Sequence, residues 1–343
     1  MRRISKETKI GNVKIGGNNP VAIQSMTNTL TKDADKTIKQ IHQLEEAGCE
    51  IIRVAVPDME SAIALKQIKE NMNVPLVADI HYDYKLAIEA AKYVDKLRIN
   101  PGNIGSQEKI KAVADAAKEH SIPIRIGVNL GSLEKDIEKA FGLTPKALVE
   151  SALKNIKLFE DNNFYDIVLS LKASDVPKTV KAYQIISNLV EYPLHLGITE
   201  SGSLFSGTIK SSIGIGSLLL DGIGDTIRVS LSADPIEEVK VAKKILESVG
   251  LRRFGVEVTA CPACARANFD VSLIAKQLEK ETEKIKKPIS IAIMGCGVNG
   301  PGEAKEADIG IVGGKSEHLF YKKGQIIKKV KENEIIDSIM KEI

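Results

Sequence analysis

The stretch EIIRVAVPDMESAIALKQIKENMNVPLVADIH, residues 50–81, contains a complete strand–helix–strand unit. Its two ends, EIIRVAV from Glu50 and PLVADIH from Pro75, are short and almost continuously apolar, which is typical of strands buried on both faces. Between them, MESAIALKQIKENM has the mixed polar and apolar spacing of an amphipathic helix. Two buried parallel strands joined by a helix are the repeating unit of α/β folds.

The same kind of apolar run recurs six more times within the first 230 residues. The runs are PVAIQSMT from Pro20, KLRINP from Lys96, IPIRIGVN from Ile122, DIVLSLKAS from Asp166, PLHLGITE from Pro193 and DTIRVSL from Asp225. Helical patterns separate most of them, and only the Gly- and Ser-rich segment 201–221 resists assignment. Eight strands, each followed by a helix, predict an α/β fold with an N-terminal (β/α)8 TIM barrel. A doubly wound open sheet is the alternative, although GIGSLL from Gly214 lacks the third glycine of a dinucleotide-binding loop.

The pattern changes after Gly250. FGVEVTA, ISIAIMG and DIGIVGG read as strands, and VSLIAKQLEKETEKI and ENEIIDSIMKEI read as helices. We therefore expect two domains, a substrate-binding barrel over residues 1–249 and a smaller α+β domain over residues 250–343.

Composition narrows the classes of function. The formal net charge is only +3 and tryptophan is absent, so neither the overall field nor aromatic stacking favours a nucleic-acid partner. No run approaches the roughly 20 apolar residues that span a bilayer, and the N-terminus lacks the apolar core of a secretory signal. We expect a cytoplasmic protein with no membrane partner, in which four cysteines indicate metal or redox chemistry rather than disulfides.

Charged side chains occupy strands that should otherwise be apolar. In a TIM-barrel enzyme the active site lies at the C-terminal ends of the strands. Five cations fall on these segments, namely Arg53, Arg98, Arg125, Lys172 and Arg228. Any one of them could belong to a buried ion pair, but burying the whole set without a counter-ion would cost several kcal/mol per charge. The set therefore predicts a site for a multiply charged anion such as a diphosphate.

Other polar residues lie at the same strand ends. They are Asp79, His81, Asn100, Asn129, His195, Glu200 and Ser230. Glu200 ends a strand at the entrance to a Gly- and Ser-rich loop, which should turn its carboxylate toward the barrel mouth. The histidines are ambiguous, since a structural role is the more common one for a histidine in a strand.

Three cysteines cluster in the second domain with the spacing C-x2-C-x31-C, as Cys261, Cys264 and Cys296. A thioredoxin-type disulfide would leave Cys296 unused, whereas a Cys3His zinc site with His318 stays open. The Gly- and Pro-rich loop GCGVNGPGE favours a bulkier group, because such backbone can approach an iron–sulfur cluster and direct N–H groups at its sulfurs. Cys49 lies far away and is expected to be a small buried apolar residue.

Together, CPAC, GCGVNGPGE, QSMTNT, RINPGN, RIGVN and GITESG resemble the 4-hydroxy-3-methylbut-2-enyl diphosphate synthase family of the non-mevalonate isoprenoid pathway, in its two-domain bacterial form. The resemblance covers nearly the whole chain; Gly297 departs from it, where a larger aliphatic residue is expected. It implies a [4Fe–4S] cluster held by Cys261, Cys264, Cys296 and Glu303. Without it, Glu303 reads equally well as an acid at a helix N-terminus.

The resemblance also implies a reaction and partners. The substrate would be the cyclic diphosphate of 2-C-methylerythritol, reduced by two electrons from flavodoxin or ferredoxin, and the enzyme would be a homodimer. The diphosphate would be held by the five cations with Asn100, Asn129 and Ser230, while Asp79 and His81 line the pocket and Glu200 handles protons. Two other functions stay open: a non-redox lyase or transferase with structural zinc, and an iron–sulfur electron carrier or sensor.

Overall fold

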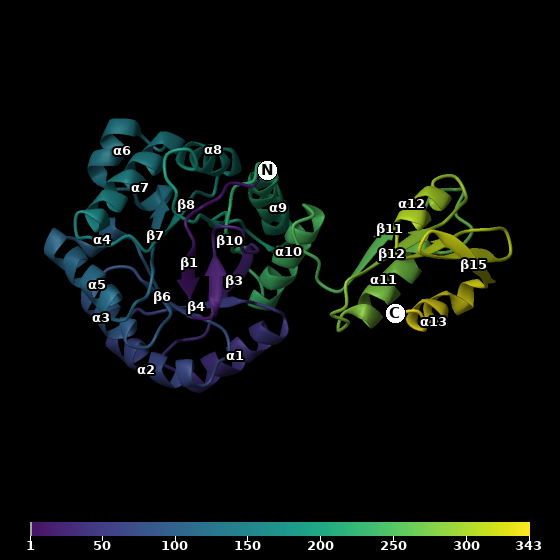
Figure 1. Cartoon of the computed structure of the whole chain (residues 1–343), viewed down its shortest axis with the longest axis horizontal. Coiled ribbons are helices and arrows are strands. Elements are labelled where there is room, and N and C mark those ends of the chain that lie inside the picture. The colour runs from purple at the N-terminus through teal and green to yellow at the C-terminus, as the bar shows by residue number, and fades with distance from the viewer. Residues whose placement is uncertain (1) are drawn as a thin grey trace. The chain divides into compact units, whose positions relative to one another are not determined.

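The computed structural model describes residues 2–343, which divide into a barrel unit ending at Arg252 and a second unit, Arg253–Ile343 (Figure 1). The barrel unit contains one eight-stranded sheet in the order β8-β7-β6-β5-β4-β3-β10-β9. Every pairing is parallel, and a single bridge between Leu169 and Leu194 joins the two outer strands and closes the barrel. The strands are β3 (Ala22–Met26), β4 (Ile51–Ala55), β5 (Leu76–Ile80), β6 (Lys96–Ile99), β7 (Ile124–Asn129), β8 (Ile167–Lys172), β9 (His195–Leu196) and β10 (Thr226–Ile227).

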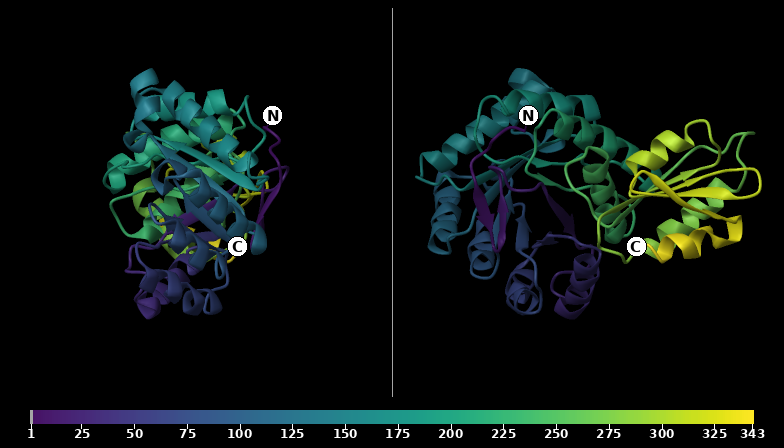
Figure 2. Two further views of the ribbon diagram at one scale, coloured as in Figure 1. Left: turned by 90° about the vertical axis from the view of Figure 1, so that its left-hand side faces the viewer. Right: turned by 45° about the vertical axis from the view of Figure 1, so that its right-hand side comes forward.

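Helices surround these strands, as Figures 1 and 2 show from three directions. They are α1 (Ala34–Glu46), α2 (Met59–Glu70), α3 (Tyr84–Ala91), α4 (Pro101–Ile104), α5 (Gln107–Glu119), α6 (Lys135–Phe141), α7 (Pro145–Glu160), α8 (Val176–Ile186), α9 (Leu204–Leu220) and α10 (Pro235–Ser248), with a 3-10 turn, η1 (Leu130–Ser132). Several begin at side-chain caps; the Thr144 hydroxyl, for example, accepts the Ala147 N–H ahead of Pro145.

An N-terminal hairpin of β1 (Thr8–Ile10) and β2 (Val13–Ile15) packs on the strand starts. Ile10 and Ile15 are fully buried in a cluster with the barrel residues Ala22, Ile51, Val77 and Val168. Ahead of the hairpin, the Arg2 guanidinium forms an ion pair of 2.9 Å with Asp225. The N-terminus is thereby tied to the loop before β10, and the barrel bottom is sealed.

The second unit is a mixed sheet between helices. Its strands run in the order β11-β12-β13-β14-β15, parallel up to β13 and antiparallel after it. Isoleucines 289, 291 and 293 of β12 pack with α11, whereas Ala292 and Met294 pack with Ala304 of α12 on the opposite face. The elements are β11 (Val256–Ala260), α11 (Val271–Thr282), β12 (Ile289–Met294), α12 (Gly300–Glu306), β13 (Ile309–Val312), β14 (His318–Lys322), β15 (Gln325–Val330), η2 (Glu332–Glu334) and α13 (Ile335–Met340).

The predicted fold class is confirmed, and the open-sheet alternative is wrong because the sheet closes on itself. The segment left unassigned, 201–221, is mostly the 17-residue helix α9. The N-terminal hairpin was not predicted, because strands of three residues carry almost no periodicity. Within residues 2–343, no helix combines the length and apolar character needed to cross a bilayer.

Candidate functional site

A layer of charged side chains crosses the C-terminal half of the barrel. Strand register places Asp79 beside Arg98 and Arg98 beside Arg125, so three adjacent strands present charges at one level. Arg53 pairs with Val77 and so lies two residues closer to the N-terminal end of the barrel than Asp79 does. Lys172 ends β8 beside Asn129. All of the predicted strand cations except Arg228 are at least nine-tenths buried. The structure therefore gathers these sequence-predicted residues into one site.

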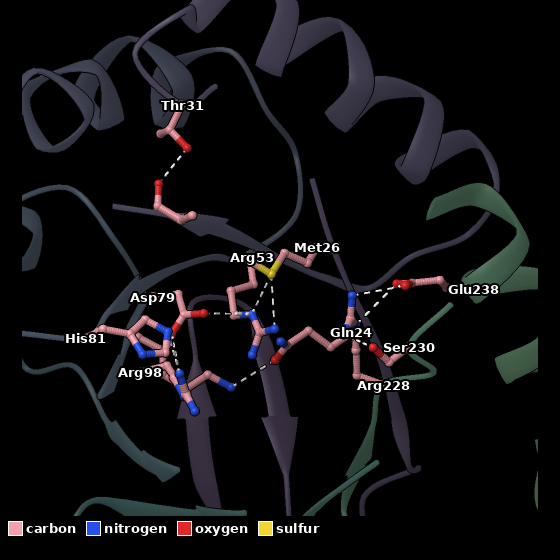
Figure 3. Close-up of polar contacts among 12 residues, drawn as sticks. Gln24, Met26, Thr31, Arg53, Asp79, His81, Arg98, Arg228, Ser230 and Glu238 are labelled. Atoms are coloured by element: carbon pink, nitrogen blue, oxygen red, sulfur yellow. Dashed lines mark hydrogen bonds and ion pairs between the residues drawn. The ribbon is translucent and has the colours of Figure 1, made fainter. Parts of the chain in front are cut away.

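Asp79 is the acid at the centre of this layer (Figure 3). It accepts a hydrogen bond of 2.8 Å from Nη1 of Arg98 and lies 3.6 Å from Nε of Arg53. The half-exposed His81 ring extends the cluster, with Nε2 at 2.9 Å from the same Arg98 nitrogen. Burial alone would raise the pKa of Asp79, but the two guanidinium groups hold it well below its usual value. Asp79 thus stays ionised and orients two arginines.

A second acid, Glu238 of α10, orients Arg228. Its two carboxylate oxygens contact Nη2 and Nε of Arg228 at 3.0 and 3.2 Å (Figure 3). Ser25 and the Leu231 N–H also donate to Glu238, at 3.0 Å each. Nη1 of Arg228 remains to contact the Ser230 hydroxyl at 2.7 Å. The bidentate contact fixes the guanidinium plane.

Three further cations have no acid beside them. Within residues 2–343, Lys96, Arg125 and Lys172 form no ion pair, and Nε and Nη1 of Arg125 have no hydrogen-bond partner. Six buried or half-buried cations therefore face two carboxylates, those of Asp79 and Glu238. An uncompensated buried charge costs several kcal/mol, and a bound polyanion would compensate this excess.

Lys96, Gln24 and Glu238 were missed from the sequence. Lys96 is completely buried two residues before Arg98 on β6, and its only hydrogen-bond partner among the described residues is Gln24 at 3.4 Å. Lys96 begins the run KLRINP, where a lysine reads as a strand edge, and Gln24 lies inside the run PVAIQSMT as an uncharged polar residue. Glu238 sits in the acidic first turn of α10, which is indistinguishable from a solvated helix start. The period-two spacing of Lys96 and Arg98 was the available signal that both face inward.

The electrostatics predict how ligand-free stability depends on pH. Burial, with the charges of Arg125 and Arg53, lowers the pKa of Lys172 and of Lys96 well below the usual 10.5. The unfolded chain then binds more protons than the folded one, so stability should rise with pH between the lowered values and 10.5. We expect the Tm to increase from about pH 7 to about pH 8.5, and inorganic pyrophosphate to flatten this slope by restoring the charge of Lys172. A Tm that falls over this pH range in both wild type and Lys172→Met would contradict a lowered pKa for Lys172.

The remaining predicted residues lie at the rim. Asn100 directly follows β6 as the N-cap of α4, with its side-chain oxygen accepting the Gly102 N–H at 3.2 Å and its amide nitrogen 3.4 Å from the Ser132 hydroxyl. Glu200 is exposed and has φ of +52°, a left-handed conformation uncommon for glutamate. Strained residues of this kind collect at functional sites, which supports the prediction for Glu200 without assigning its role.

Two residues with expected structural roles are fully enclosed. Nδ1 of His195 lies 2.8 Å from the Thr226 hydroxyl, and burial among cations lowers the pKa of His195 well below its usual value. Cys49 is buried, as predicted, and its thiol contacts the Ile51 carbonyl at 3.2 Å. Burial raises the pKa of Cys49 to about 12, so this thiol is unreactive.

In the second unit, the cysteines follow the ends of two neighbouring parallel strands. Cys261 comes directly after β11 and Cys296 two residues after β12, and the Gly295 N–H donates to the Cys261 sulfur at 3.2 Å. Glu303 lies in the first turn of α12, which starts four residues beyond Cys296. All three thiols are free and at least partly exposed. The predicted donor set therefore comes from the segments that follow two neighbouring strands: Cys261 and Cys264 after β11, and Cys296 and Glu303 after β12.

These residues suit an iron–sulfur group. A Cβ at Gly297 or Gly302 would meet no atom within 4 Å, so the backbone beside Cys296 and Glu303 borders open space. Thiolates with N–H donors at their sulfurs are typical cluster ligands. His318 is engaged elsewhere: Nδ1 accepts the Gly314 N–H at 3.3 Å, and the ring packs on Phe269. Among residues 2–343, no three His, Cys, Asp or Glu side chains lie close enough together to hold a metal ion, and this applies to the proposed cluster ligands as well as to a zinc site.

Comparisons with known proteins cover both units. The model of the GcpE TIM-barrel domain matches residues 5–243, and that of the GcpE protein C-terminal domain matches residues 257–343. A protein of Caldanaerobacter subterraneus subsp. tengcongensis named 4-hydroxy-3-methylbut-2-en-1-yl diphosphate synthase (flavodoxin) is 60% identical, over 100% of this chain and 97% of its own. One of the same name from Clostridium acetobutylicum is 58% identical, over 100% and 99%.

Two solved structures of other enzymes match a length of this chain close to that of the barrel unit. N-acetylneuraminic acid synthetase from Leptospira borgpetersenii matches with a TM-score of 0.53 at 17% identity, covering 73% of this chain and 92% of its own. Dihydropteroate synthase from Stenotrophomonas maltophilia also gives 0.53, at 12% identity, covering 71% and 98%. At these identities the likeness shows a shared fold alone.

Proposed function

The chain belongs to the GcpE family, and we infer from this that it reduces 2-C-methyl-D-erythritol 2,4-cyclodiphosphate to 4-hydroxy-3-methylbut-2-enyl diphosphate. It is an iron–sulfur oxidoreductase of isoprenoid biosynthesis. Two electrons and two protons enter, the ring opens, and one oxygen leaves as water. The observation that carries the assignment to this chain's own residues is the buried excess of cations over carboxylates in the barrel, since a diphosphate supplies the missing negative charge.

We propose that the diphosphate lies against the strand cations. Arg125 offers two unpaired nitrogens and Lys172 an unpaired ammonium, which makes them the strongest phosphate ligands of the set. Arg53 and Arg98 are held in place by Asp79, and Arg228 by Glu238, so their guanidinium planes are preorganised. Asn100, Asn129 and Ser230 add polar contacts at the rim, and His81 lines the same side as Asp79.

Glu200 is proposed to move the proton that the departing hydroxyl needs. The support for this role is that Glu200 is exposed and follows β9, at the strand end where TIM-barrel active sites lie. Cys261, Cys264, Cys296 and Glu303 are proposed to hold a [4Fe–4S] cluster. When bound, this group supplies electrons and Lewis acidity, and the weaker carboxylate ligand leaves one iron open to exchange.

The test is anaerobic purification followed by iron, sulfide and zinc analysis. We expect a brown protein with about four irons and four sulfides per chain. Cys296→Ser should lose most of the iron, while Cys49→Ala, the matched control at the fourth cysteine, should keep it. A colourless protein with one zinc per chain would support the non-redox alternative instead. A brown protein that does not bind the cyclic diphosphate would support the electron carrier.

We also propose a homodimer, with α9 in its interface. Phe205, Ile209, Ile213 and Leu220 are all exposed and fall within an arc of about 80° on this helix, at 100° per residue. Phe205 and Leu220 are 78% and 73% exposed, which is unusual for large apolar side chains on one helix face. A second copy of the chain would bury this face symmetrically.

Sedimentation at micromolar concentration distinguishes the outcomes. We expect wild type to sediment as a dimer and Ile213→Asp to sediment as a monomer, because the charge would be buried in the interface. Leu189→Asp is the control, since Leu189 is similarly exposed but lies beyond α8. A monomeric wild type would contradict the proposed homodimer.

We also propose a cytoplasmic location and a flavodoxin-type electron donor. Ferredoxin is the other donor to assay.

A further inference from the structure

Two glycines face the charged layer of the barrel, where large side chains would be expected. Interior positions of a TIM barrel are normally filled by bulky residues. Gly127 lies two residues after Arg125 on β7 and Gly197 directly follows β9, so both occupy inward-facing positions. Neither has a positive φ, so backbone conformation does not require glycine at either place.

The space that each glycine leaves is filled by a cation from the neighbouring strand. A Cβ added at Gly127 would lie 2.5 Å from Nε and 2.7 Å from Nη2 of Arg98. A Cβ added at Gly197 would lie 2.7 Å from Nζ of Lys172. Real Cβ atoms essentially never approach other atoms below 3.0 Å, so either cation would have to move. In both cases the displaced atoms are those that carry the charge.

We infer that Gly127 and Gly197 are positioning residues, which act by leaving room for the Arg98 and Lys172 charges to point at the substrate diphosphate. The inference rests on the proposed function for the identity of the anion. Arg98 depends on this room because its Nη1 is bound to Asp79, leaving Nη2 on the glycine side to reach a ligand. A methyl group at residue 127 would push that side of the guanidinium away.

The test is a double-mutant cycle with inorganic pyrophosphate as the titrant. Gly127→Ala should weaken pyrophosphate binding by roughly 10- to 100-fold, the loss of a hydrogen bond to a charged group. In an Arg98→Ala background the same change should cost less than about twofold, because nothing is left to displace. Gly216→Ala on α9 is the control and should bind like wild type, since the nearest atom to its added Cβ is 4.0 Å away.

If Gly127→Ala binds pyrophosphate as wild type does, or if its loss is equally large without Arg98, the inference is overturned. If Gly127→Ala fails to fold, Arg98→Ala should restore folding in the double variant, as judged by circular dichroism, and failure to do so also overturns it. A wild type that binds neither pyrophosphate nor the cyclic diphosphate would instead contradict the proposed function. Gly197→Ala additionally meets the Arg228 carbonyl at 2.7 Å, so Gly127 is the cleaner test.

Discussion

Glu200→Gln is expected to turn over at least about 100-fold more slowly than wild type, with substrate affinity nearly unchanged. Glutamine keeps the size of the side chain and tolerates the same backbone as glutamate, but it cannot give or take a proton. The φ of +52° shows that the chain holds this residue in a conformation that glutamate rarely adopts. The measurement is steady-state kinetics with a chemical reductant, so that kcat and KM are separated.

Two companion variants separate chemistry from backbone strain. Glu200→Gly should be as slow as Glu200→Gln yet more stable, by about 1 kcal/mol, because glycine accepts a left-handed φ without penalty. Glu191→Gln, at an exposed residue preceding β9, should be fully active. Normal turnover in Glu200→Gln would remove Glu200 from the proton transfer and leave it a purely structural residue.

Arg125→Met is expected to change affinity and stability in opposite directions. Arg125 is 1% exposed, has two nitrogens without partners, and pairs with no carboxylate among residues 2–343. Burial, reinforced by Arg53 and Arg98, lowers the pKa of Arg125 well below its usual value. Losing its charge should cost about 2–5 kcal/mol of diphosphate binding, which is roughly 30- to 5000-fold in Kd.

The same substitution should raise the Tm of the ligand-free protein, because it removes an unpaired buried charge and keeps the volume filled. Calorimetric titration and thermal melts of one sample measure both effects. Iron content should be unchanged, since the proposed cluster ligands belong to the other unit. Weaker binding together with a lower Tm would mean that Arg125 supports the barrel rather than the ligand.

The site residues that could be predicted from the sequence are those that interrupt a regular apolar pattern. Arg53 and Arg125 stand out because a charge interrupts an apolar strand, and the barrel rule then places them at one end. Lys96 lies at a strand start and Glu238 in the first turn of a helix, where charged residues are common. Only the two-residue spacing from Arg98 marks Lys96 in the sequence, and nothing marks Glu238 until the fold brings it to Arg228. Gly197 falls within the GITESG motif, but the sequence does not show that its missing side chain leaves room for Lys172 of the neighbouring strand.

The second unit shows the same limit. Three cysteines and a Gly-rich loop predicted a metal or cluster site, but their spacing alone could not choose zinc or iron. His318 could be set aside only once its ring was seen against Phe269 with Nδ1 bound to the backbone. Glu303 lies in the first turn of α12, where the fold alone would suit an acid at a helix N-terminus equally well, so its proposed role as a ligand rests on the family resemblance.

The pairing of β3 with both β4 and β10 determines when the barrel can be completed during synthesis. Gln24 of β3 pairs with Ile51, 27 residues later, whereas Ala22 pairs with Thr226, 204 residues later, so the ring closes only after Thr226 has left the ribosome. Until then β3 presents a free edge, which in a nascent chain invites wrong pairing. The β1–β2 hairpin is made first and can already cover Ala22 and Ile51 with Ile10 and Ile15. The ion pair between Arg2 and Asp225 can form only after Asp225, which directly precedes β10, has been synthesised. This contact therefore forms at the same stage as closure of the ring.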